Sequence, residues 1–256
     1  VDYHSSVGLM IFNEIDQSSG YTHNKIALPL CYDFSISKNM QIRFGLEGSY
    51  SQQNFNVGNF IFSDQLDAFG NITGLSAESL SSGRVNYFDA SFGVLGYSEA
   101  LWFGFAAHNL FQNNISFMEG SDYQLKTRFS GHMGYRYRFH NLSRNTRRNI
   151  AIMPTFSFTN QGPLNRLDVG LYNVIEPLIL GVFYGTDPTA FEENNFISFM
   201  VGLKKNTFTT IYSYDLSLSE GASKQGFHEI SINYLFEITS GKPPLAMRRT
   251  KCPVFL

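Results

Sequence analysis

Apolar residues alternate with small or polar residues along most of the chain, and this period of two is the strongest constraint on its fold. In residues 196–204, the apolar positions are Ile197, Phe199, Val201 and Leu203. The positions between them are Ser198, Met200, Gly202 and Lys204. Such alternation is typical of β-strands whose two faces meet different surroundings.

About twelve such runs follow one another, and most are about nine to fifteen residues long. Their approximate ranges are 5–14, 22–36, 40–53, 85–97, 101–111, 124–139, 149–159, 165–173, 177–186, 195–204, 207–217 and 227–239. Soluble strands usually have about five or six residues, whereas a tilted strand crosses a bilayer with about nine to eleven. No block of about 18 apolar residues occurs, so we expect no membrane-spanning helix.

The connections between the runs are mostly tight at every second position, which predicts an up-and-down barrel with short periplasmic turns and longer surface loops. Tight connections are expected at 37–39, 98–100, 174–176 and 205–206. The connection at 55–84 is the longest. Two connections depart from the rule, because 160–164 is short for a surface loop and the basic segment 140–148 is long for a periplasmic turn.

Composition indicates which solvent the apolar face meets. The chain is 16% aromatic, with 25 Phe and 14 Tyr, but only 16% charged, against about a quarter in a soluble domain. Glycines recur on the opposite face, at Gly8, Gly45, Gly93, Gly104, Gly134, Gly170, Gly181 and Gly202. We therefore expect the apolar face to meet lipid, and a large soluble β-protein is the alternative.

Charged side chains gather on the predicted lumen face. We predict a lumen charge network of Glu47, Asp89, Lys126, Arg128, Arg136, Arg138, Asp168, Asp215 and Glu229. The four basic residues follow one strand. Two interpretations stay open: a selective channel or ligand cavity with a basic wall, and ion pairs that hold a small barrel closed.

Two segments outside the predicted strands are candidates for partner binding. The connection 55–84 contains Phe60, Phe62, Leu66 and Phe69, and it could plug the lumen, contact a partner or remain a mobile loop. The end of the chain, 241–256, carries Arg248, Arg249 and Lys251. We expect this tail in the periplasm, either as a contact for an inner partner or as a disordered extension.

Motifs for catalysis or cofactor binding are weak. Cys31 and Cys252 show no metal or redox spacing, and the sequence contains no P-loop, GxGxxG or HExxH pattern. Glu47, Asp89 and His108 could form a hydrolytic site, but no serine motif accompanies them. We expect no enzyme activity, no metal and no cofactor.

Four short segments occur in the order found in a known family. They are FGFAAHNLFQ at 103–112, RFSGHMGYRYRF at 128–139, IMPTF at 152–156 and KCPVF at 251–255. Together they resemble the PorP/SprF family of type IX secretion system membrane proteins. The family's opening Asn-Pro-Ala-Tyr segment and first strands have no counterpart here.

The resemblance implies an outer-membrane barrel in a Gram-negative bacterium of the Bacteroidetes type. About fourteen strands are expected once two opening strands are added, with the barrel at 1–240 and the tail at 241–256. It also implies a non-enzymatic role in secretion and often in gliding motility. The leading hypothesis is that the barrel anchors the C-terminal domain of a secreted adhesin or other cargo and links it to periplasmic machinery. The alternative is an outer-membrane pore or small-solute transporter.

Overall fold

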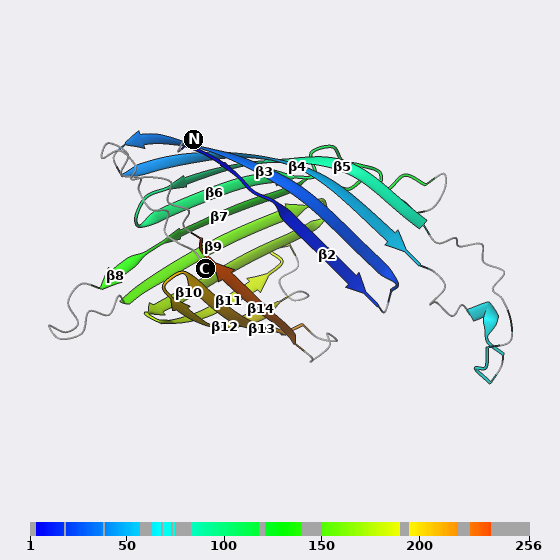
Figure 1. Cartoon of the computed structure of the whole chain (residues 1–256). Coiled ribbons are helices and arrows are strands. Elements are labelled where there is room, and N and C mark those ends of the chain that lie inside the picture. The colour runs from blue at the N-terminus through cyan, green and yellow to red at the C-terminus, as the bar shows by residue number, and fades with distance from the viewer. Residues whose placement is uncertain are drawn as a thin grey trace. The chain divides into compact units, whose positions relative to one another are not determined.

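The computed structural model describes residues 4–17, 19–37, 39–56, 63–67, 69–72, 74, 83–117, 121–139, 150–189, 195–219 and 226–236. This part of the chain folds into β-strands, with one short 3₁₀ helix at Ser63–Gln65 (Figure 1). Within these residues, no helix is long and apolar enough to cross a membrane. The expected boundary at residue 240 lies outside the described residues.

Fourteen strands are present in the described part of the chain. They are β1 (Ser5–Val7), β2 (Met10–Asp16), β3 (Tyr21–Ser37), β4 (Met40–Phe55), β5 (Gly83–Tyr97), β6 (Leu101–His108), β7 (Arg128–Tyr135), β8 (Tyr137–Phe139), β9 (Ile150–Gln161), β10 (Leu164–Ile175), β11 (Leu178–Thr186), β12 (Phe196–Lys205), β13 (Phe208–Ser217) and β14 (Phe227–Tyr234).

The strands pair in chain order, which is the up-and-down arrangement predicted from the sequence. The path through the sheet is β1-β3-β4-β5-β6-β7-β9-β10-β11-β12-β13-β14, while β2 pairs with β3 and β8 pairs with β9. Figure 1 shows β9 to β13 side by side, and their registers are antiparallel. The all-β fold class is therefore confirmed. Each predicted run corresponds to one place in this path, because the first run covers β1 and β2 and the sixth covers β7 and β8.

The chain divides into two compact units, which we describe separately. The first unit comprises residues 1–32, 45–92 and 107–127, and the second comprises residues 33–44, 93–106 and 128–256. The long strands β3, β4 and β5 contribute one portion to each unit.

One predicted strand is interrupted, at Arg136 between β7 and β8. Gly134 pairs with Thr155 and Tyr137 with Ile152, so the ladder is broken beside Pro154 of β9. Proline has no amide hydrogen to donate to a neighbouring strand. On the side of β6, the backbone N–H of Arg136 donates to the carbonyl oxygen of Ala100, at 2.7 Å.

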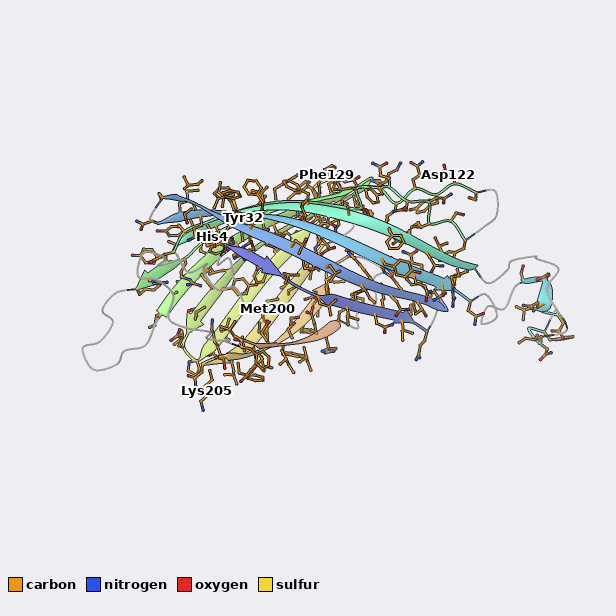
Figure 2. The ribbon with its side chains drawn as sticks, turned by 45° about the horizontal axis from the view of Figure 1, so that its top comes forward. His4, Tyr32, Asp122, Phe129, Met200 and Lys205 are labelled. Carbon is orange, nitrogen blue, oxygen red and sulfur yellow. The ribbon has the colours of Figure 1, made fainter. Side chains whose placement is uncertain are left out.

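The two faces of the sheet differ as the alternation predicts. On β12, Phe199 is 50% exposed, whereas its neighbour Ser198 is 6% exposed. We call the face of Phe199 the outer face and the face of Ser198 the inner face. Phe105 and Phe129 stack on the outer face, with ring centroids 6.2 Å apart, and Figure 2 shows Phe129 projecting from the sheet. In the first unit, the rings of His4 and Tyr32 stack at 6.0 Å (Figure 2).

Glycines on the inner face of the second unit lie beneath aromatic rings. A Cβ at Gly134 would overlap the indole of Trp102, and one at Gly170 would overlap the ring of Phe183. Gly185 stands in the same relation to Phe196. The small residues thus let large rings lie close to the backbone of neighbouring strands, which is the close packing expected from the glycine pattern.

A buried cluster lies on the same inner face. Tyr97 and Trp102 are each 3% exposed and Met153 is 2% exposed, although their strands are β5, β6 and β9. Partly buried Leu95, Tyr172 and Val174 pack against them. Inward-pointing side chains therefore fill this part of the inner face.

Because Trp102 is held within that cluster, Gly134→Ala should lower the free energy of unfolding by about 1–3 kcal/mol. Gly48→Ala is the matched control, since a Cβ at Gly48 meets no heavy atom within 4 Å. Urea unfolding of the detergent-purified protein, followed by the fluorescence of the single tryptophan, measures both changes. Equal stabilities of the two variants would contradict the packing of Trp102 on Gly134.

Candidate functional site

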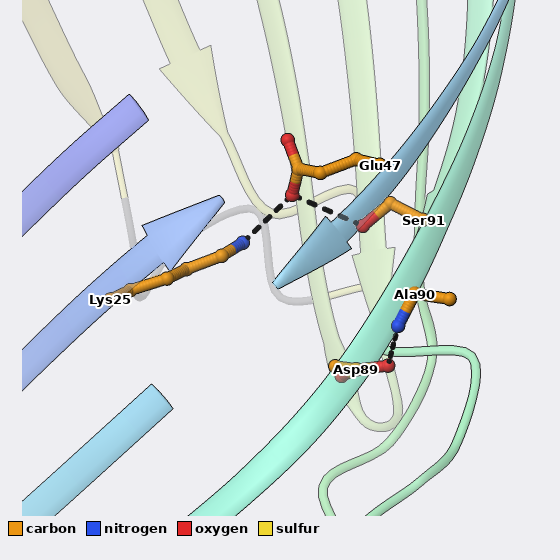
Figure 3. Close-up of polar contacts among 5 residues, drawn as sticks. All are labelled: Lys25, Glu47, Asp89, Ala90 and Ser91. Atoms are coloured by element: carbon orange, nitrogen blue, oxygen red, sulfur yellow. Dashed lines mark hydrogen bonds and ion pairs between the residues drawn. The ribbon is translucent and has the colours of Figure 1, made fainter. Parts of the chain in front are cut away.

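An ion pair joins β3 and β4 on the inner face of the first unit. The Nζ atom of Lys25 lies 3.0 Å from Oε1 of Glu47, and both side chains are about four-fifths buried. The hydroxyl of Ser91 donates to the same oxygen at 3.5 Å, as Figure 3 shows. Glu47 was predicted in a lumen network, whereas its partner Lys25 was not. The alternation places Lys25 on the same face as Glu47, and this is the signal in the sequence that could have identified the pair.

Asp89 holds the connection that follows β6. It is 6% exposed, and its Oδ1 atom accepts a hydrogen bond from the backbone N–H of Ala90 at 2.7 Å (Figure 3). The same atom accepts a hydrogen bond from the backbone N–H of Phe111 at 3.2 Å. Among the described residues, its buried Oδ2 atom has no hydrogen-bond partner. The Nδ2 group of Asn113 also donates to the carbonyl oxygen of Phe88, at 2.8 Å. Asp89 and Asn113 therefore attach this connection to β5.

In the second unit, the most enclosed ion pair joins Asp33 and Arg43. The Nε and Nη2 groups of Arg43 donate to the two carboxylate oxygens of Asp33, at 2.6 and 2.9 Å. The guanidinium carbon lies 5.8 Å from the centroid of the Tyr97 ring. The hydroxyl of Tyr97 donates to Oε1 of Gln41 at 2.7 Å, so the ion pair borders the buried cluster. Neither charged residue was predicted as a site residue.

A cavity of about 520 Å³ lies on the inner face of the second unit. Three residues of the predicted charge network line it, namely Asp168, Asp215 and Glu229. Arg166, which the sequence did not single out, also lines it. Its Nε group donates to the Asp168 oxygens at 3.0 and 3.1 Å, and its guanidinium carbon lies 4.3 Å from the Phe196 ring centroid.

The predicted basic residues occupy different places. Arg128 lies in β7 and Arg138 in β8, while Arg136 lies between these strands and Lys126 precedes β7. The expectation of four basic residues in one strand is therefore wrong. The Nε group of Arg136 lies 3.4 Å from the sulfur of Met153. The ion pairs described above use Lys25, Arg43 and Arg166 as their cations. A network of all nine predicted residues stays a prediction.

The connection between β4 and β5 exposes apolar side chains. Phe69 is 90% exposed, and Leu66 forms an isolated bridge with Ile72. The carboxylate of Asp67 accepts hydrogen bonds from the backbone N–H groups of Asn71 at 2.9 Å and Phe69 at 2.8 Å. These bonds lower the pKa of Asp67 below its ordinary value because they favour the charged form, and the bond from Asn71 has the largest effect.

Some predicted positions lie outside the part of the chain that the structure describes. Phe60 and Phe62 lie outside the described residues, as do Arg248, Arg249 and Lys251 of the tail. Among the described residues, no three His, Cys, Asp or Glu side chains form a group that could hold a metal ion.

Residues 1–234 match the family described as "Type IX secretion system membrane protein PorP/SprF". The chain belongs to the PorP/SprF family. Family membership confirms the resemblance noted in the short motifs, and together with the all-β fold it confirms the expected location in the outer membrane. PorP/SprF is a family of secretion system membrane components and not an enzyme family.

The chain was also compared with curated proteins and with solved structures. A search among curated proteins found no match. Among solved structures, the chain is similar to a FadL homologue of Pseudomonas aeruginosa, with a TM-score of 0.41 and 11% sequence identity. The similarity covers 91% of this chain and 73% of the other.

The Asp33–Arg43 pair should matter more for stability than the Arg166–Asp168 pair of this family member. Asp33→Asn removes the charge that faces Arg43, and the Asp33 side chain is only 7% exposed. We therefore expect this variant to lower the free energy of unfolding by about 1–3 kcal/mol. Arg166→Gln should cost less than about 1 kcal/mol, because the Arg166 side chain is 56% exposed. Urea unfolding of both variants tests this order, and a larger loss for Arg166→Gln would contradict it.

Proposed function

We propose that this PorP/SprF member is a non-enzymatic outer-membrane β-barrel that anchors a secreted protein at the cell surface. It would bind the C-terminal domain of an adhesin or other cargo and link it to periplasmic secretion or motility components. Family membership supplies the secretion context. The observation that carries the proposal is the exposed apolar connection between β4 and β5, above all Phe69.

Phe69 supports partner binding because it lies outside the strands that would meet lipid. Phe69 is 90% exposed, and burial in a partner would remove its apolar surface from water. Leu66 and Ile72, which are also exposed, extend the apolar surface in the same connection. We propose that these side chains contact the cargo, and that Arg248, Arg249 and Lys251 contact a periplasmic partner.

The packed inner face favours anchoring over conduction. The buried cluster on this face consists of Tyr97, Trp102 and Met153. An open channel would need side chains in contact with water there. The pore hypothesis draws its support from the carboxylates at the cavity, which a permeating solute could meet.

Copurification tests the anchoring role. The protein, extracted from outer membranes in mild detergent, should retain a secreted protein by its C-terminal domain. The double variant Leu66→Ser/Phe69→Ser should recover roughly tenfold less cargo, because the lost apolar contacts lie in a partner interface. Tyr123→Ser is the control, since Tyr123 is a similarly exposed aromatic residue in the connection before β7.

Two results would contradict the proposal. One is recovery of the wild-type protein alone under conditions that preserve other outer-membrane complexes. The other is equal cargo retention by the double variant and by Tyr123→Ser.

Planar-bilayer recording separates the two candidate functions. We expect the wild-type protein to give no steady conductance, because the buried cluster fills part of the inner face. An open porin, reconstituted in the same way, serves as the positive control. A steady, ion-selective conductance of the wild-type protein would instead support the pore.

A further inference from the structure

The cavity on the inner face of the second unit has walls of two chemical kinds. One kind is aromatic: Phe183 lies over Gly170 and Phe196 over Gly185, while Trp102 and Tyr172 belong both to the cavity lining and to the buried cluster. Each phenylalanine ring therefore lies close to the backbone of a neighbouring strand. The cavity thus has an aromatic wall.

The other wall is acidic. Ser213 pairs with Glu229 and Asp215 with Phe227, so the two carboxylates project from adjacent strands, about one two-residue step apart along the ladder. Among the described residues, the carboxylate of Asp215 has no hydrogen bond or ion pair, and the carboxylate of Glu229 accepts only a hydrogen bond from the hydroxyl of Ser231, at 3.0 Å. Three carboxylates thus line a cavity that holds one guanidinium, that of Arg166.

Arg166 shows which chemistry this environment accommodates. Its guanidinium lies over the ring of Phe196 and donates to the carboxylate of Asp168. A cation above an aromatic face and beside a carboxylate is stabilised by both groups. Asp215, Glu229 and the ring of Phe183 line the same cavity, so carboxylates and an aromatic ring occur together there as well. Among the described residues, no cation pairs with these two carboxylates.

We propose that the cavity binds an organic cation, namely a guanidinium or ammonium group on a short apolar stem. The charged head pairs with Asp215 and Glu229, and the stem packs on the aromatic wall formed by Phe183 and Trp102. A volume of about 520 Å³ is large enough for such a group but small for a folded domain. The cation is either a free small molecule or an arginine or lysine side chain of a secreted chain.

Trp102 provides the measurement, because it is the single tryptophan of the chain and lines the cavity. The full chain, purified in detergent, is titrated with n-butylguanidinium while tryptophan fluorescence is recorded. The neutral isostere n-butylurea is the matched control probe. We expect a saturable change with the cation and none with the urea; equal responses to the two probes, or no saturable response, would overturn the proposal.

Isosteric variants locate the charge. Asp215→Asn and Glu229→Gln should each weaken binding of n-butylguanidinium roughly tenfold, since each removes one charge-assisted contact. Asp122→Asn, in the exposed connection before β7, should leave the affinity unchanged. Unaltered affinity in both cavity variants, with urea unfolding like that of the wild type, would overturn the assignment.

A second pair of probes distinguishes the sources of the cation. Binding of N-acetyl-arginine amide, but not of N-acetyl-citrulline amide, supports an arginine side chain as the ligand. Binding of n-butylguanidinium alone supports a free small cation. These measurements use the purified protein without cargo, so their failure leaves the anchoring proposal to its own copurification test.

Discussion

Backbone pairing between neighbouring strands is the constraint on which the other features of this protein depend. Within a bilayer, an unpaired N–H or C=O group costs several kcal/mol, so each strand must find its partners in the sheet. Pro154 shows how strictly this holds. It leaves β9 one donor short, and the ladder between β7 and β9 ends beside it, while the N–H of Arg136 donates to Ala100 on the side of β6.

A paired sheet determines which side chains share a face, and the two faces then have different requirements. The outer face needs apolar side chains for lipid, which accounts for the low charge fraction of the chain. The inner face must accommodate large rings from several strands within a small space. Glycine at 134, 170 and 185 solves this by giving Trp102, Phe183 and Phe196 a backbone surface to lie on.

Strands and faces could be predicted because a period of two follows from strand geometry alone. Ion-pair partners could not, since Lys25–Glu47 and Asp33–Arg43 depend on which strands are adjacent and in what register. Lys126 was misplaced because alternation does not mark the first hydrogen-bonded residue of a strand. Asp168, Asp215 and Glu229 line one cavity, and alternation along single strands does not show that they come together there.

The inner face of the second unit therefore has two parts, one filled by apolar side chains and one that leaves a cavity lined by carboxylates. Around Tyr97, Trp102 and Met153 it buries apolar surface, which stabilises the sheet and removes space for water. Beside that cluster it leaves room around Asp215 and Glu229, two carboxylates on adjacent strands that line the same cavity. A sequence selected only for a filled interior would place neutral side chains there, as it does at Ser198 and Ser213. Two carboxylates beside aromatic rings in one cavity are the arrangement expected where a cation from outside binds.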